Sequence, residues 1–315
     1  MAVEICRYEP AWHSRWDSFV RESKNGTFLF SRDYMDYHRD RFYDYSLLVL
    51  DRGQVLGVLP ANQADDRIYS HQGLTYGGLI TLPQMTTPRF LDAFSVVLDY
   101  FRAVGIRRLF YKTMPTIYHR LPAEEDRYAL FLAGASLYRR DVLSVVTAAS
   151  PGQVQARRRR GSLKARKRGT VVEKSENWAG FWPLLTDNLL HGHGVRPVHD
   201  LAEIDRLRLR FPDNIHLHLA RAEGRILAGA VIYESENVAH VQYMSASDAG
   251  REGGALDLLM LHLLEEVYPS KPFFDFGISN EQDGRLLNRG LIEQKEGFGA
   301  RTFVHDHYEL VLDGG

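Results

Sequence analysis

The sequence has almost no cysteine and no excess of charge of either sign. Cys6 is the only cysteine in 315 residues, which excludes a disulfide within the chain and every zinc motif built on several cysteines. The 39 basic and 40 acidic residues nearly cancel, so bulk charge does not indicate a nucleic-acid-binding protein. Any contact with a nucleic acid must therefore come from a local basic patch, and a reducing compartment is expected.

Long apolar runs and the common catalytic motifs are also missing. No segment reaches the roughly eighteen apolar residues of a membrane-spanning helix, and the opening MAVEICRYEP has charges where a signal peptide would be apolar. We therefore expect a cytoplasmic protein with no transmembrane segment. The HExxH, P-loop, GxSxG and GxGxxG motifs do not occur, which removes the usual signs of zinc proteases, NTPases, serine hydrolases and dinucleotide enzymes.

The apolar content of 44% is enough for one large core or two medium ones, and we expect two. The pattern predicts an N-terminal domain over residues 1–150, a basic linker helix over 151–169 and a C-terminal domain over 170–315. Each half is expected to hold a helix pair, antiparallel strands, a longer helix and a further strand. The longer helices are predicted over 87–104 and 255–268, and a helix in the first half is predicted to begin after the N-cap Ser31. Two of the strands are predicted over 108–112 and 225–234. This order predicts a mixed α/β (α+β) fold.

The most informative stretch runs from Lys271 to Phe303. Its apolar run from Phe273 to Ile278 indicates a buried strand, and Gly277 would allow close approach of a ligand or another backbone. A polar loop and a short helix follow, and they would deliver Lys295 to the end of the sheet. A lysine there could stabilise an oxyanion or hold an acidic group, although a solvated or ion-paired lysine is the simpler alternative.

The steepest charge asymmetry lies just after Pro151 and Gly152. Eight basic residues occur between Arg157 and Arg168 with no acid among them. Four of these basic side chains would share one face of a helix and form a stripe suited to phosphates. They are Arg157, Arg160, Lys164 and Lys167. A solvated linker helix is the alternative interpretation.

Two further patterns each allow a functional and a simpler structural explanation. In HQGLTYGGLIT, glycines flank Thr75 and Tyr76, so a ligand could approach the backbone there, or the segment is only a bend between strands. Three histidine pairs have one residue between their members, a spacing that puts both rings on one face of a strand. They are His191/His193, His216/His218 and His305/His307. Without a cysteine or a recognisable third ligand, we predict no metal site.

Two C-terminal motifs carry a family resemblance. FDFG at Phe274–Gly277 and QKEGFGA at Gln294–Ala300 resemble elements of the Fem-type (FemABX) aminoacyltransferases and the BioF2-like acetyltransferase domains of the GNAT superfamily. The basic run at 157–172 and the segment from His193 resemble the same proteins, and the match covers nearly the whole chain. The resemblance implies two tandem GNAT-like domains, each with a mixed, largely antiparallel sheet flanked by helices.

The resemblance also implies an activity, namely transfer of an acyl group to an amine to form an amide bond. It implies that Lys295 acts on the oxyanion or positions the donor and that Tyr243 lies near the leaving group. Thr75, Tyr76 and Asp275 are the implied acceptor-binding residues. Direct attack by the amine would need no covalent enzyme intermediate and no cofactor.

The identity of the donor depends on one turn. GNAT enzymes bind the CoA pyrophosphate in a Q/R-x-x-G-x-G/A turn, and here DAGREGGALDLL offers Gly250, Arg251, Gly253, Gly254 and Ala255. Gly250 stands where Gln or Arg is expected, which favours aminoacyl-tRNA as donor, with the basic stripe along its phosphates. Acetyl-CoA or another acyl-CoA as co-substrate is the alternative, and a non-catalytic RNA-binding module is the other. The amine acceptor, whether peptide, amino sugar or small metabolite, is not specified by the sequence.

Overall fold

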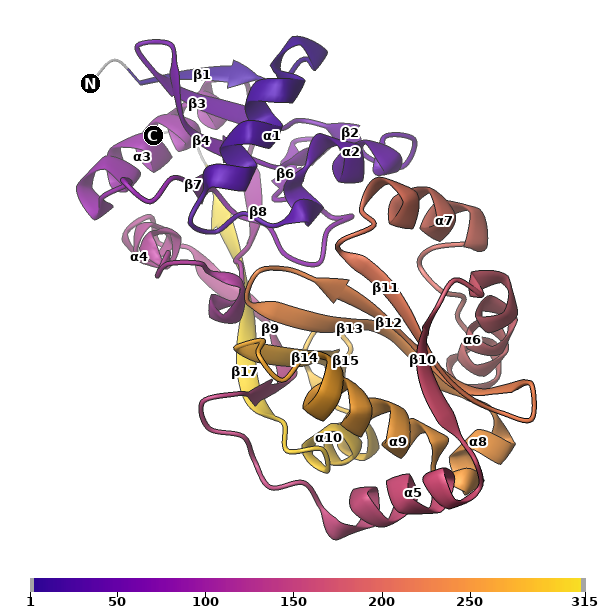
Figure 1. Cartoon of the computed structure of the whole chain (residues 1–315). Helices are drawn as coiled ribbons and strands as arrows, with labels where there is room; N and C mark the ends of the chain where they lie inside the picture. Colours follow the sequence, from indigo (N-terminus) through magenta and orange to yellow (C-terminus); the bar gives the residue numbers. More distant parts are fainter. Residues whose placement is uncertain (1–2, 313–315) are drawn as a thin grey trace. The chain divides into compact units, whose positions relative to one another are not determined.

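The computed structural model describes residues 3–312, which fold into two compact units (Figure 1). The first unit runs from the N-terminal strand to Asp141 and also takes Asp283–Arg285 and the chain from Val304 onward. The second unit holds Val142–Gln282 and Leu286–Phe303. The last strand thus contributes to the first unit, whereas the sequence pattern assigned it to the C-terminal domain. The predicted domain boundaries stay predictions.

Within the described residues 3–312, the first unit contains two groups of strands and four α-helices. One sheet has the order β1-β3-β4-β7 and is antiparallel throughout. The second group has the order β17-β8-β6-β5-β2, in which only β6 and β8 pair in parallel. The strands are β1 (Val3–Arg7), β2 (Tyr43–Asp44), β3 (Leu47–Asp51), β4 (Gln54–Leu59), β5 (Asn62–Ala64), β6 (Arg67–Tyr69), β7 (Ile80–Thr81), β8 (Arg108–Lys112) and β17 (Arg301–Val311). The helices are α1 (His13–Glu22), α2 (Arg32–Met35), α3 (Thr87–Ala103) and α4 (Glu125–Leu132).

The core of the first unit follows from the spacing of apolar residues along α3. Phe90, Phe94, Val97 and Phe101 recur at helical spacing and are buried, so one face of the helix packs into the core. A proline in the first turn helps the helix begin, and Gly105, with φ of 82°, follows its end. The predicted helix over 87–104 therefore forms almost as expected.

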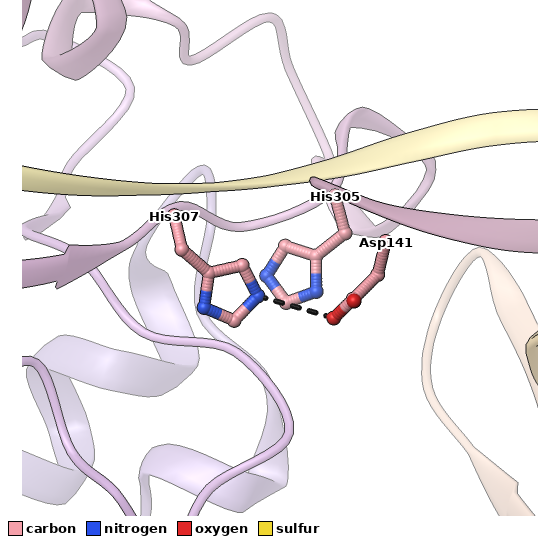
Figure 2. Close-up of side chains that lie close together, drawn as sticks. All are labelled: Asp141, His305 and His307. Atoms are coloured by element: carbon pink, nitrogen blue, oxygen red, sulfur yellow. Dashed lines mark ion pairs between the residues drawn. The ribbon is translucent and has the colours of Figure 1, made fainter. Parts of the chain in front are cut away.

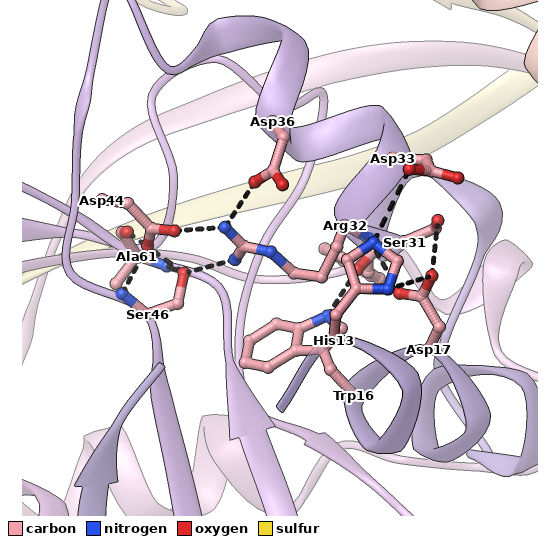
Figure 3. Close-up of polar contacts among 11 residues, drawn as sticks. His13, Trp16, Asp17, Ser31, Arg32, Asp33, Asp36, Asp44, Ser46 and Ala61 are labelled. Atoms are coloured by element: carbon pink, nitrogen blue, oxygen red, sulfur yellow. Dashed lines mark hydrogen bonds and ion pairs between the residues drawn. The ribbon is translucent and has the colours of Figure 1, made fainter. Parts of the chain in front are cut away.

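A buried arginine fastens the segment after α1 (Figure 3). The guanidinium of Arg32 is bonded to the carboxylates of Asp36 and Asp44, and it lies 3.7 Å from the centre of the Tyr8 ring. Because the Arg32 side chain is buried, removing its carboxylate partners would leave an uncompensated buried ion, which typically costs about 3 to 5 kcal/mol. The predicted helix after Ser31 is only the four-residue α2 followed by a 3-10 turn.

The second unit is built around one sheet of order β10-β11-β12-β13-β14-β9. Its strands pair antiparallel except for the parallel pair of β13 and β14. The strands are β9 (Ser136–Thr147), β10 (Val171–Ser175), β11 (Ile215–Ala222), β12 (Arg225–Glu234), β13 (Val238–Ala246) and β14 (Phe273–Ile278), and a hairpin is formed by β15 (Asn280–Glu281) and β16 (Leu286–Leu287). The helices are α5 (Ala156–Lys167), α6 (Trp178–His193), α7 (Leu201–Arg210), α8 (Asp248–Gly253), α9 (Ala255–His262) and α10 (Arg289–Glu296).

Local sequence explains several ends of these helices. At the start of α7 the Asp200 carboxylate accepts from the Glu203 N–H while the Glu203 carboxylate accepts from the Asp200 N–H, which is a complete capping box. The helix predicted over 255–268 instead ends as α9 at His262 and continues as a π-turn over Leu263–Val267. The predicted mixed, largely antiparallel architecture is confirmed in both units. Among residues 3–312, no helix combines the length and the apolar character needed to cross a bilayer.

Candidate active site

The parallel strands β13 and β14 separate soon after they begin to pair. Only Val238–His240 and Phe273–Asp275 are paired, and β13 runs on to Ala246 without β14 beside it. The register between β12 and β13 shifts here, because Val231 pairs with Tyr243 and Ile232 with Val241, so Gln242 is an extra residue. A bulge of this kind bends the strand. The result is a fork in the sheet with His240 at its base.

A cavity of about 750 Å³ lies at the end of β13 in the second unit. This volume is within the range of small-molecule and cofactor sites. The end of β13 forms one wall, and the start of α5, the second half of α6, the α8–α9 junction and α10 form the others. The lining residues are Arg157, Arg158, Leu185, Asn188, Leu189, His191, Gly192, Met244, Ser245, Ala246, Arg251, Gly254, Leu256, Asp257, Gly290, Glu293 and Gln294.

The predicted donor turn is the junction between α8 and α9. Gly253 ends α8, Gly254 has φ of 80° and Ala255 begins α9. A Cβ on Gly254 would lie 2.3 Å from the Gly161 carbonyl oxygen, and one on Gly250 would lie 2.0 Å from that of Leu227, so both glycines permit close backbone packing. Of the five predicted residues, Arg251 and Gly254 line the cavity. The sequence predicted a turn before one helix and missed α8, because two glycines in six residues are unfavourable for a helix.

The charges of the cavity are mixed. Arg157, Arg158 and Arg251 line it together with two acids, Asp257 and Glu293. Arg158 Nη1 lies 2.8 Å from Asp257 Oδ1, in the first turn of α9. Burial raises the pKa of the Asp257 carboxyl despite this arginine. A phosphate at this helix N-terminus would therefore compete with the Asp257 carboxylate.

The basic stripe predicted on α5 is present as an exposed face. Arg157, Arg160, Lys164 and Lys167 are exposed, and none has a carboxylate partner among residues 3–312. The remaining basic residues of α5 differ, because Arg159 pairs with Glu265 and Arg166 pairs with Glu266. Arg157 belongs to both the stripe and the cavity wall, so the two features adjoin. We call these four residues the α5 stripe.

Lys295 reaches the end of β14, as the sequence predicts. Its ammonium donates to the carbonyl oxygens of Gly277 at 3.1 Å and Ile278 at 2.5 Å, so it fastens α10 to the strand end. An ammonium has three donors, and one remains after these two bonds. Burial lowers the pKa of Lys295 to about 8, and the nearby Asp275 opposes this only in part. Lys295 is not among the described residues that line the cavity, and its catalytic role stays a prediction.

The fork contains a histidine that sequence reasoning missed. His240 Nδ1 lies 2.9 Å from Asp275 Oδ2, and the other carboxylate oxygen of Asp275 accepts from the Gly277 N–H at 2.7 Å. Asp275 is 1% exposed and its carboxylate is held between His240 and the strand backbone, and its predicted role in binding the acceptor stays a prediction. Because Nδ1 faces the carboxylate, Nε2 is the nitrogen left to accept a proton. This is the arrangement of an oriented general base.

The other predicted site residues lie elsewhere. The Tyr243 hydroxyl accepts from the His199 N–H at 3.2 Å and lies 2.6 Å from His199 Nδ1, and burial raises the pKa of Tyr243 to about 12. In the first unit, Tyr76 is buried and its hydroxyl is bonded to Thr27 at 2.9 Å, whereas Thr75 is exposed. Tyr76 is thus held inside the unit. The roles assigned to Tyr243, Thr75 and Tyr76 stay predictions.

Comparisons with known proteins address the fold and the second unit. Residues 153–283 match the family model described as an acetyltransferase (GNAT) domain. No curated protein sequence matches the chain. Among solved structures, FemX is 13% identical with a TM-score of 0.68, and the match covers 98% of this chain and 97% of FemX. L-PGS from Bacillus licheniformis is 11% identical with a TM-score of 0.62, over 97% of this chain and 92% of that one.

A third structure bears on the tandem arrangement. A tandem GNAT protein from the clavulanic acid biosynthesis pathway is 10% identical with a TM-score of 0.52, and the match covers 99% of both chains. At these identities the structural likeness concerns the fold alone. The predicted resemblance is confirmed: residues 153–283 match the acetyltransferase (GNAT) domain model, and the chain has the fold of FemX and of the tandem GNAT protein.

Proposed function

We propose that the protein transfers an aminoacyl group from aminoacyl-tRNA to the amine of a peptide, amino sugar or small metabolite. The observation that carries this proposal is the α5 stripe, which has no carboxylate partner among residues 3–312 and adjoins the cavity through Arg157. Arg157 and Lys164 donate to the backbone carbonyl oxygens of Glu293 and Glu252, which leaves their charges uncompensated. Four adjacent cations without a carboxylate partner among the described residues suit a polyphosphate backbone, and counterion release would drive its binding. The use of aminoacyl-tRNA as donor implies a cytoplasmic location.

The chemistry needs only the two substrates and the residues at the fork. The acceptor amine attacks the carbonyl of the aminoacyl ester, so that a C–N bond forms and the ester C–O bond breaks. His240 Nε2 takes one proton from the attacking amine and returns it to the ribose oxygen that leaves. The remaining N–H of Lys295 donates to the oxyanion, and Asp275 holds the His240 ring.

The proposal is tested by following discharge of a radiolabelled aminoacyl-tRNA pool with a panel of amine acceptors. The wild type is expected to discharge the tRNA and form a labelled amide. The triple variant Arg160→Gln/Lys164→Gln/Lys167→Gln should lose at least about tenfold in discharge at moderate salt, because three phosphate contacts are removed. The matched control Arg159→Gln/Arg166→Gln, on the same helix but already paired with acids, should stay within about twofold. If no acceptor led to discharge of the aminoacyl-tRNA, the proposal would be wrong.

Acyl-CoA is the second candidate donor, because three arginines and the start of α9 line the cavity. A rise in melting temperature with acetyl-CoA that survives added salt, together with full activity of the triple variant, would favour this donor. A non-catalytic RNA-binding protein would instead bind tRNA through the α5 stripe, and its biological activity would be unchanged by Lys295→Met.

A further inference from the structure

A second cluster of chemistry-bearing side chains lies in the first unit (Figure 2). Asp141 comes from β9, and His305 and His307 come from β17. The two histidines are separated by one residue on a strand, so their rings lie on the same side, with centroids 4.5 Å apart. All three side chains are buried, and one possible ligand atom from each lies within 4.8 Å of the others. None of the three belongs to the proposed acyl-transfer site.

The hydrogen bonds leave ring nitrogens directed at the cluster. His305 Nε2 donates to the Thr113 carbonyl oxygen at 2.7 Å, which leaves Nδ1 with a lone pair. A ring N–H bonded to a backbone carbonyl is the usual outer-shell support of a metal-binding histidine. His307 Nε2 lies 3.3 Å from Asp141 Oδ2 but without the geometry of a hydrogen bond, so this buried nitrogen has no hydrogen-bond partner among residues 3–312.

We propose that Asp141, His305 and His307 bind a divalent metal ion of the zinc class, with water in the fourth position. Two imidazole nitrogens and one carboxylate oxygen are a ligand set that zinc accepts. Bonds of about 2.0 to 2.2 Å in a tetrahedron place ligand atoms about 3.3 Å apart. The separation of His307 Nε2 from Asp141 Oδ2 is already 3.3 Å, so the His305 ring is the ligand that must move toward the ion.

Two cationic side chains lie beside the cluster. Arg139 donates to both oxygens of Asp141 at 3.0 Å and therefore orients the carboxylate from outside. The ammonium of Lys112 lies nearby and donates to the carbonyl oxygens of His71 and Leu74, away from the cluster. These two cations weaken the affinity for a metal but do not occupy its place. The ion would join β9 to β17 within the first unit.

The test uses the full-length protein after treatment with a chelator. Zinc is added in a calorimetric titration, metal content is measured after desalting, and Co²⁺ serves as a spectroscopic probe of coordination. We expect one zinc ion per chain, a higher melting temperature with zinc and the visible absorption bands of four-coordinate Co²⁺. His307→Gln and Asp141→Asn should each weaken zinc binding at least tenfold. The control His218→Gln removes a buried histidine with the same spacing to a neighbour, and it should bind zinc as the wild type does.

The alternative occupant of this cluster is a proton on His307, paired with Asp141. In that case the wild type would retain no zinc after desalting and would give only the spectrum of aqueous Co²⁺, and the proposal would be wrong. Because this arm uses the unaltered chain, it remains decisive even where a variant does not fold. Equal zinc binding by His307→Gln, Asp141→Asn and the wild type would overturn the assignment of the ligands.

Discussion

At the scale of single residues, Lys295 is a basic side chain buried at the end of a strand. Its pKa is lowered to about 8 by burial, below the usual value of 10.5 in the unfolded chain. Below pH 8 both states carry the charge, so the cost of burying it is fully present. Between pH 8 and 10.5 the folded state loses its proton first, and stability therefore rises with pH in this window.

The prediction follows by comparison with Lys295→Met. The free energy of unfolding of the wild type, relative to this variant, should increase on the order of 3 kcal/mol from pH 8 to pH 10.5. Urea unfolding at several pH values measures this difference. The other lysines contribute equally to both proteins, so their contribution cancels in the comparison. A difference that does not change with pH would mean that Lys295 is solvated in the folded protein.

His240 is the residue for which the structure changes the interpretation most. If its Nε2 accepts the proton of the attacking amine, His240→Gln should reduce kcat for amide formation about 100-fold with little change in KM. Asp275→Asn should lower the rate less and should also alter the pH profile of kcat, because the ring loses its orienting carboxylate. His262→Gln, which removes a histidine of α9 paired with Glu266, is the control and should stay within about twofold.

At the scale of elements, the sequence predicts long periodic segments well and short or glycine-rich ones poorly. The strands β8 and β12 form over the predicted residues, and α3 differs by one residue at its end. By contrast β2, β5, β6 and β7 have two or three residues each, too few to show a period. The helix α8 was missed because glycines allow its close packing while weakening its propensity.

The junction of α8 and α9 gives a prediction for Gly254. This residue has a positive φ, and a Cβ there would also collide with the carbonyl of Gly161 in α5. Gly224 has a similar φ of 75° but open space around the same position. Gly254→Ala should therefore destabilise the protein by at least about 1 kcal/mol more than Gly224→Ala, since both share the backbone strain. Thermal and urea unfolding of the two variants measure this difference. Equal losses in the free energy of unfolding would show that α5 moves away from the added Cβ without destabilising the protein.

At the scale of the whole molecule, the contacts that define both candidate sites join distant parts of the chain. Lys295 was placed at a strand end from its local pattern alone, and it is found there. The contact of His240 with Asp275 needs the register of two parallel strands that are 35 residues apart in sequence. The cluster of Asp141 with His305 and His307 likewise needs β9 beside the last strand. Such pairs cannot be predicted from spacing along the sequence.

Whole-molecule charge also determines how tRNA binding should depend on salt. The net charge is −1, so the protein as a whole does not attract a polyanion, and binding must depend on the α5 stripe. Each phosphate neutralised contributes about 0.7 to 0.9 to the slope of log K against log salt. We expect a slope of about −3 for the wild type, and Arg160→Gln/Lys164→Gln/Lys167→Gln should reduce its magnitude by about 2.

Fluorescence anisotropy with labelled tRNA, from about 50 to about 200 mM salt, measures these slopes. Arg159→Gln/Arg166→Gln should keep the wild-type slope, because those arginines are already neutralised by Glu265 and Glu266. If both variants lost the same amount of slope, attraction would depend on the total charge of α5 rather than on one face. A slope near zero for the wild type would mean that the α5 stripe does not bind nucleic acid. The cavity, with its three arginines, would then be the place where a smaller donor binds.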